Sequence, residues 1–176
     1  MESRYWKEML LATARELARR RKPKPLTERR CELIERDVIL CFFMIRRLIE
    51  LSRVSRLTLD FKFDTYSCPF NGKYITPFAR HGIERYYDLE IETAGSKKML
   101  YVANQFIHSS LFLITTDQTR NLDSFYVVSD YDKKECIWRI LVRQIAEAFK
   151  LAGKDYLKGC RCEYDEKKAE YRMVLE

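Results

Sequence analysis

The stretch VILCFFMI, residues 38–45, has no charged or hydrogen-bonding polar side chain for two turns of a helix. It is too short to cross a membrane, which takes roughly 18 to 20 apolar residues. A helix that is apolar all round is buried on several sides. The apolar spacing continues on both sides of this run and predicts a helix from about 27 to 53, with Thr27 as its N-cap. We therefore expect this helix at the centre of the fold.

A second helix is predicted just before it. Apolar residues recur at spacings of three and four over residues 4–21. The sequence KPKP at 22–25 ends this helix, because proline lacks an amide hydrogen and clashes with the preceding turn. The two helices, about 4–21 and 27–53, are expected to pack against each other as an antiparallel hairpin.

The rest of the chain is predicted to form mainly β-strands. Apolar and polar residues alternate over 57–64 and 87–91, which predicts half-buried strands. We further expect short strands at 111–114 and 125–128, a short helix at 97–109, a helix at 137–152 ended by Gly153, and a terminal hairpin over 160–175. The chain is thus predicted to be one α+β domain, 1–176, with a basic helical hairpin (1–56) packed on an antiparallel or mixed sheet of about five to six strands in 57–176.

Composition excludes several classes of protein. Of the 176 residues, 47% are hydrophobic and 34% charged, with only 5 Gly and 4 Pro. These values exclude a disordered or collagen-like chain. The first residues carry charges among their apolar positions, unlike a signal peptide. We expect a soluble, cytoplasmic protein with no membrane partner.

Positive charge is concentrated near the start of the chain. Residues 1–56 hold 15 Lys and Arg against 8 Asp and Glu, whereas residues 57–176 hold 18 of each sign. Such a cluster suits phosphate contacts with nucleic acid, and equally suits a solvated face. The candidate nucleic-acid-binding residues are Arg15, Arg19, Arg20, Arg21, Lys22 and Lys24.

One histidine is the strongest catalytic candidate. His108 shares a helical face with Asn104, at a spacing of four, and precedes Ser109. Asp130 follows the strand at 125–128. A general base needs such groups to converge, which spacing alone does not show. A hydrogen-bonded structural histidine and a helix-capping Asp130 are the alternative interpretation.

Aromatic residues crowd the segment 66–87, with Arg80 and Arg85 among them. This composition fits stacking on nucleic-acid bases, a docking site for a protein partner, or a loop held over the sheet by its own rings. The candidate partner-binding residues are Tyr66, Phe70, Tyr74, Phe78, Arg80 and Arg85.

No motif indicates a cofactor or a metal. The five glycines are dispersed and form no phosphate loop. The only close pair among the six cysteines is Cys160-Arg-Cys162, which lacks the spacing of a zinc site. The leading hypothesis is a non-catalytic protein that contacts nucleic acid or another polyanion through the basic hairpin. The alternatives are a protein-interaction subunit, which forms an oligomer or joins a complex, and a hydrolase or nuclease that uses His108.

Overall fold

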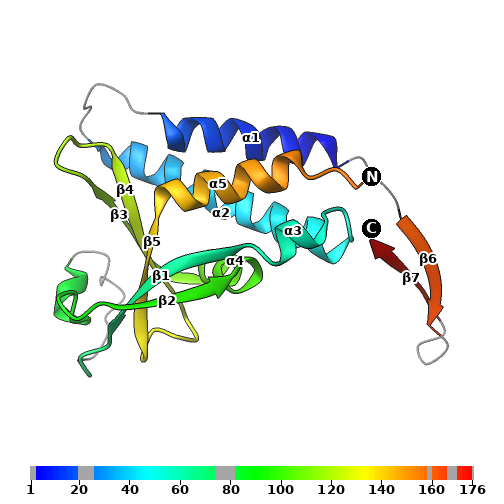
Figure 1. The fold of residues 1–176 in the computed structure, drawn as a ribbon. Coiled ribbons are helices and arrows are strands. Elements are labelled where there is room, and N and C mark those ends of the chain that lie inside the picture. Colours follow the sequence, from blue (N-terminus) through cyan, green and yellow to red (C-terminus); the bar gives the residue numbers. More distant parts are fainter. Residues whose placement is uncertain (1–2, 20–25, 74–81, 158–159, 166–169, 176) are drawn as a thin grey trace.

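The computed structural model describes residues 3–19, 26–73, 82–157, 160–165 and 170–175. The helices are α1 (Arg4–Ala18), α2 (Glu28–Glu50), α3 (Arg56–Leu59), α4 (Met99–Ile107) and α5 (Val142–Lys154), with a 3-10 turn at Ile83–Arg85. The strands are β1 (Lys62–Pro69), β2 (Thr93–Lys98), β3 (Ser109–Thr116), β4 (Leu122–Ser129), β5 (Cys136–Leu141), β6 (Cys160–Asp165) and β7 (Glu170–Leu175). The predicted α+β class is confirmed (Figure 1).

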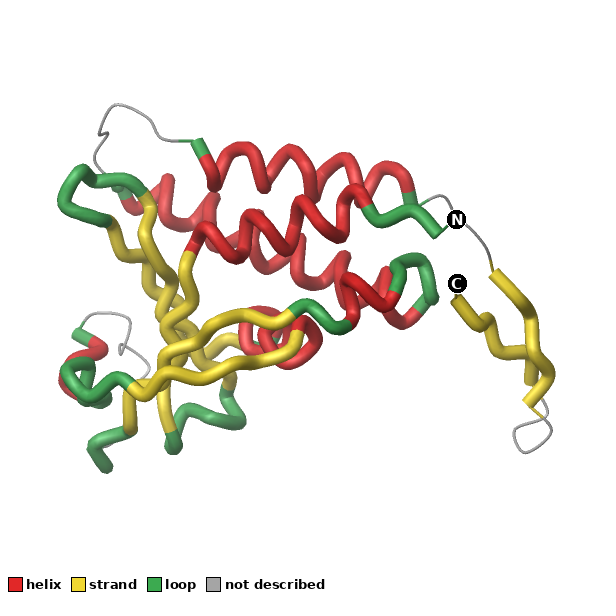
Figure 2. Tube along the Cα trace, viewed as in Figure 1, coloured by secondary structure: helices red, strands yellow, loops and turns green. Residues whose placement is uncertain are grey.

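The main sheet has five strands in the order β2-β1-β5-β4-β3, and all neighbours are antiparallel. Helices lie over one face of it, and the main core forms between them and the sheet (Figure 2). Phe42 of α2 is at the centre of this core. Its ring stacks on Phe106 of α4 at 4.5 Å and meets the edge of Phe149 of α5 at 5.0 Å. The helix therefore contributes to the centre of the core, as predicted, but it is not buried on several sides, because Leu40 and Phe43 are exposed.

The opposite face of the sheet is partly covered by the chain itself. Consecutive residues of a strand point to opposite faces, so Val127 joins the main core and Val128 joins a second, smaller cluster. Segment 82–92 closes this cluster with Ile83, Tyr86 and Tyr87.

An ion pair holds the end of that covering segment. The Arg139 guanidinium donates two hydrogen bonds of 2.6 Å to the Glu92 carboxylate, and it lies 4.3 Å from the centre of the Tyr66 ring. These hydrogen bonds hold the pKa of Glu92 below its usual range.

Two predicted strands were placed wrongly. The expected strand at 57–64 begins only at Lys62, because Ser55 caps a short helix, α3, whose Thr58 is buried while Leu57 is 73% exposed. The expected strand at 87–91 is reduced to one bridge between Tyr87 and Phe70. The chain instead forms β2 at residues 93–98, where it pairs with residues 62–67 of β1.

The late helix was also predicted to start too early. Residues 136–141 form β5, the central strand of the sheet, and α5 begins at Val142. Both faces of β5 are covered, so Ile137 and Trp138 are both buried and the alternation typical of a strand is lost. Gly153 does not end the helix, which continues through Lys154.

The first helix has a different main neighbour from the one expected. Helix α1 packs chiefly on α5 and less on α2, so 4–21 and 27–53 are not primarily partners in a hairpin. Helices α1 and α5 run antiparallel, since the start of α1 meets the end of α5. There the buried Lys7 ammonium donates to the carbonyl oxygens of Arg53 and Asp155. Burial lowers the pKa of Lys7.

The terminal hairpin β6–β7 forms as predicted, but as a separate two-stranded sheet. Figure 1 shows it beyond the ends of α1 and α3, apart from the five-stranded sheet. The turn of the hairpin was predicted at 165–168, of which Asp165 is the last residue of β6 and residues 166–168 lie outside the described residues.

A candidate polyanion-binding groove

A groove of about 920 Å³ runs between α1 and α5. Its floor is formed by small and apolar side chains of both helices, including Ala14, Leu17 and Ala146. The β3–β4 turn closes one end with Asp117, which is held by hydrogen bonds within that turn. The groove is therefore an open channel with apolar walls and charged rims.

The two helices approach each other closely at the other end of the groove, at Gly153. A Cβ atom at Gly153 would lie 2.8 Å from Leu11 Cγ and 3.0 Å from the Lys7 carbonyl oxygen. Only glycine allows this approach, because atoms at such distances overlap. The close contact at Gly153 fixes how α1 lies on α5 along the length of the groove.

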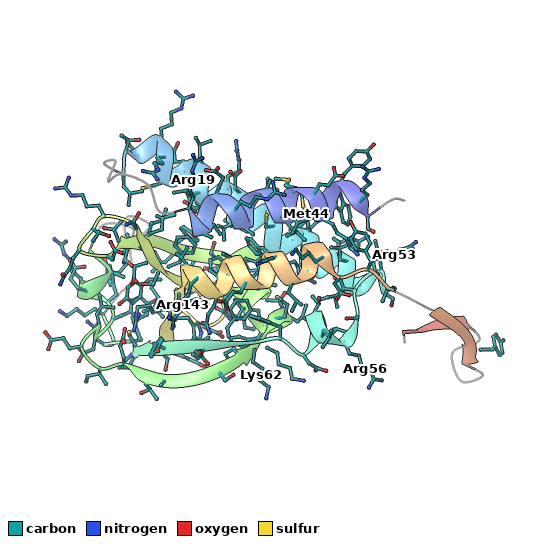
Figure 3. All side chains as sticks on the ribbon, turned by 45° about the horizontal axis from the view of Figure 1, so that its top comes forward. Arg19, Met44, Arg53, Arg56, Lys62 and Arg143 are labelled. Carbon is teal, nitrogen blue, oxygen red and sulfur yellow. The ribbon has the colours of Figure 1, made fainter. Side chains whose placement is uncertain are left out.

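Positive side chains from both helices line the groove. Helix α1 supplies Arg15 and Arg19, and α5 supplies Arg143, Lys150 and Lys154. The α5 residues follow helical spacing and so form one stripe, in which Glu147 is the acidic member. Figure 3 shows that Arg19 and Arg143 lie at the same end of the helix pair.

Most of these cations have no acidic partner within the described chain. Arg19 has a loose ion pair with Glu16 at 3.7 Å. No ion pair joins Arg15, Arg143, Lys150 or Lys154 to a carboxylate in the described residues. All four side chains are exposed, so their charges are available to a ligand in solution.

A smaller hollow of about 200 Å³ lies on the other side of α1, against α2. Leu17 and Arg19 border both hollows. The predicted nucleic-acid-binding residues Arg20, Arg21, Lys22 and Lys24 lie outside the described residues, and follow Arg19 directly in the chain. Of the predicted basic cluster, the structure thus places Arg15 and Arg19, both on the groove.

The predicted catalytic residues are only partly brought together. Arg46 of α2 donates to Asn104 Oδ1 at 3.2 Å, and its Nη1 lies 3.4 Å from His108 Nε2. The carboxylate of Asp130 instead pairs with Lys133, and only its backbone amide reaches the carbonyl oxygen of His108.

Two further sequence interpretations concern the same neighbourhood. Ser109 pairs with Ser129 in the β3–β4 ladder. The expectation that Asp130 caps a helix is wrong, because residues 130–135 form turns that lead into β5. Among the described residues, no carboxylate is hydrogen-bonded to His108, so its imidazole is oriented by Arg46 and not by an acid.

The predicted aromatic docking residues are largely integrated in the fold where they are described. Tyr66 lies under Arg139, and the Phe70 ring packs 5.8 Å from Tyr87. Arg85 is exposed, and its carbonyl oxygen accepts a hydrogen bond from Asn71. Tyr74, Phe78 and Arg80 lie outside the described residues.

The described thiols are poor nucleophiles. Burial raises the pKa of Cys41, Cys68 and Cys136 to about 11, which leaves little thiolate at neutral pH. The described residues contain no group of three His, Cys, Asp or Glu side chains placed to hold a metal ion.

Sequence reasoning missed the α5 half of the groove. The signal was present, since residues 143, 147, 150 and 154 all carry charge at helical spacing. It was missed because only the net charge of residues 57–176 was considered. That net charge is zero, although one helix within the range carries a stripe of basic residues. The start of α5 was also assigned wrongly.

In the part of the chain that the structure describes, no helix combines the length and apolar character needed to cross a bilayer. Comparison of the chain with protein families, with curated proteins and with solved structures finds no match.

Proposed function

We propose that this protein binds a polyanion, nucleic acid in the first place, in the groove between α1 and α5, and that it does so without catalysis. The observation that supports the proposal is the set of four cations without acidic partners on the two rims of one groove.

The length of the α5 stripe fits a phosphate backbone. At 1.5 Å per residue, Arg143 and Lys154 are separated by about 16 Å along the helix axis. That distance corresponds to roughly five nucleotide steps of about 3.4 Å along one strand of a duplex. The stripe can therefore contact several consecutive phosphates at once.

The lining of the groove favours recognition of the backbone over that of the bases. Its described side chains include no aromatic ring on which a base can stack. The cations are separated by small apolar residues, which give close access but no base-edge readout. We therefore expect binding that is independent of nucleotide sequence.

The test is fluorescence anisotropy of the protein with labelled duplex DNA and RNA. Four phosphate contacts predict a loss in affinity of about 150-fold between about 50 and 200 mM salt, from a slope near −0.9 per contact. The variant Arg143→Ala/Lys150→Ala/Lys154→Ala retains about one contact, so its affinity is expected to fall only about threefold over the same range. At low salt the variant should bind much more weakly than the wild type.

A matched control separates the groove from net charge. Arg56, Lys62 and Lys134 are exposed, and Figure 3 shows Arg56 and Lys62 on the far side of α5 from Arg19. Replacing these three with alanine removes the same charge and should leave the salt slope near that of the wild type. Equal losses in both variants, or no binding at 50 mM salt, would contradict the proposal.

A further inference from the structure

The smaller hollow of about 200 Å³ meets the groove at the end of α1. Leu17, Arg19, Asn121 and Leu122 border both of them. Figure 1 shows the end of α1, the start of α2 and the β3–β4 turn at the same end of the molecule. A strand that is bound in the groove can therefore reach the hollow with its end.

Three arginines from separate elements line this hollow. Arg19 directly follows α1, Arg30 lies in the first turn of α2, and Arg120 lies in the β3–β4 turn. A guanidinium group binds phosphate through paired hydrogen bonds, which makes arginine the preferred residue for phosphate recognition. The fold thus brings to one hollow three such groups that are far apart in the sequence.

The two carboxylates at the hollow lie next to arginines. Glu16 is 3.7 Å from Arg19, and Asp37 pairs at 2.7 Å with Arg36, which is not part of the lining. With Arg36 included, four arginines stand beside two carboxylates among the described residues at this site. The remaining positive charge favours an anionic ligand.

Arg120 holds a backbone conformation that arginine rarely adopts. Its φ is 59°, in the left-handed region that favours glycine and asparagine. The turn fixes this conformation, because the Asp117 carboxylate accepts hydrogen bonds from the amides of Thr119 and Asn121 at 2.8 and 2.9 Å. Within the described chain, no hydrogen bond or ion pair engages the Arg120 side chain. A side chain that breaks a local preference without a contact inside the fold marks a functional position.

The size and charge of the hollow fit a phosphate monoester. Sites for drug-sized ligands measure roughly 300–1,000 Å³, so a hollow of about 200 Å³ suits a smaller group. A phosphate monoester carries about 1.5 to 2 negative charges at pH 7 and three acceptor oxygens, whereas a backbone phosphate carries a single charge. Three arginines match these three oxygens better than they match a phosphate within a strand.

We propose that this hollow binds the terminal phosphate monoester of a nucleic-acid strand whose backbone lies in the groove. The inference rests on the proposed function and adds to it a preference for phosphorylated ends. Arg30 and Arg120 contact the end group, and Arg19 lies between the end group and the backbone. A 5′-phosphate and a 3′-phosphate share this chemistry, so the experiment includes both.

Fluorescence anisotropy compares internally labelled duplexes of one sequence whose ends carry a 5′-phosphate, a 3′-phosphate or only hydroxyl groups. The wild type is expected to bind one of the phosphorylated duplexes at least about tenfold more tightly than the hydroxyl-ended duplex, which is the effect of one charge-assisted hydrogen bond. The phosphate that gives the preference identifies the end that is bound. Equal affinity for all three duplexes would overturn the proposal.

The variant Arg120→Gly separates binding from folding. Glycine adopts a φ of 59° without strain, so the variant should be as stable as the wild type in urea titrations and yet bind the three duplexes with nearly equal affinity. Arg29→Ala is the matched control, because Arg29 is exposed, adjacent to Arg30 and outside both hollows. It removes the same charge and should keep the end preference. A preference that survives Arg120→Gly, or that Arg29→Ala weakens equally, would overturn the proposal.

Failure of this inference is distinguishable from failure of the proposed function. If Arg143→Ala/Lys150→Ala/Lys154→Ala binds the hydroxyl-ended duplex as tightly as the wild type, the groove is refuted as the binding site, and the end site falls with it. If that variant loses affinity while the wild type binds all three duplexes equally, the groove binds the backbone and only the end site is refuted.

Discussion

Replacing Gly153 with alanine has two opposing effects on the free energy of unfolding. Gly153 lies within α5, where alanine is favoured over glycine by about 1 kcal/mol of helix propensity. The added Cβ atom, however, would lie 2.8 Å from Leu11 Cγ and 3.0 Å from the Lys7 carbonyl oxygen. The leucine side chain can rotate, but the carbonyl oxygen belongs to α1 and moves only if the two helices separate.

Overpacking of this kind lowers stability by about 1–3 kcal/mol in well-packed cores. We expect the clash to exceed the gain in propensity, so that Gly153→Ala lowers the free energy of unfolding by about 1 kcal/mol. Urea denaturation followed by circular dichroism measures this change. Gly95→Ala is the control, because its Cβ atom would meet only Thr65 Oγ1, at 3.7 Å. A Gly153→Ala protein more stable than the wild type would refute the close approach of α1 and α5.

Three other predictions follow from contacts described by the structure. Asp155→Ala should lower the free energy of unfolding by about 2–3 kcal/mol in urea titrations, because its carboxylate accepts a 2.5 Å hydrogen bond from the fully buried Thr58 hydroxyl, which is then left unpaired. The Arg139 guanidinium lowers the pKa of Glu92, so this carboxylate stabilises the fold above its unfolded pKa of about 4.3 and loses that effect as pH falls through its folded pKa. The stability advantage of the wild type over Glu92→Gln should therefore shrink between pH 6 and pH 3.5, and a gap that does not change with pH would contradict the assigned ion pair. Cys136, whose pKa burial raises to about 11, should react with iodoacetamide at neutral pH at least 100-fold more slowly than an unhindered thiol with a pKa near 8.5, as followed by peptide mass spectrometry.

Helices and strands could be predicted from the sequence where their apolar residues recur with a single helical or strand period. Helix α2 was predicted from its apolar run and from Thr27, and the structure confirms that the Thr27 side chain caps it. The short helix α4 and the strands β3 and β4 also show a local pattern that survives in the fold. In these segments, the local preference and the tertiary environment agree.

The errors occur where a distant contact overrides the local pattern. Leu57 and Leu59 alternate with polar residues, yet Asp155, almost a hundred residues later, accepts hydrogen bonds from Ser55 and Thr58 and stabilises a helical turn. The groove was half predicted for the same reason. Its α1 side could be predicted from a run of arginines in the sequence. Its α5 side could be predicted only if the packing of α1 on α5 were known, and the spacing of residues within one segment does not show that packing.

The packing of α1 on α5 also has a consequence for the order of events during synthesis. The first helix of the chain finds its main neighbour only when residues 142–154 have been made. At roughly 5–20 residues per second, the 136 residues from Arg19 through Lys154 take about 7 to 27 s to translate. During that interval the apolar side of α1, with Leu10, Ala14 and Leu17, has no partner in α5. The nascent chain is therefore expected to complete this helix pair only after α5 has been made, and the ribosome-bound intermediate is expected to be a substrate for chaperones that recognise apolar helices.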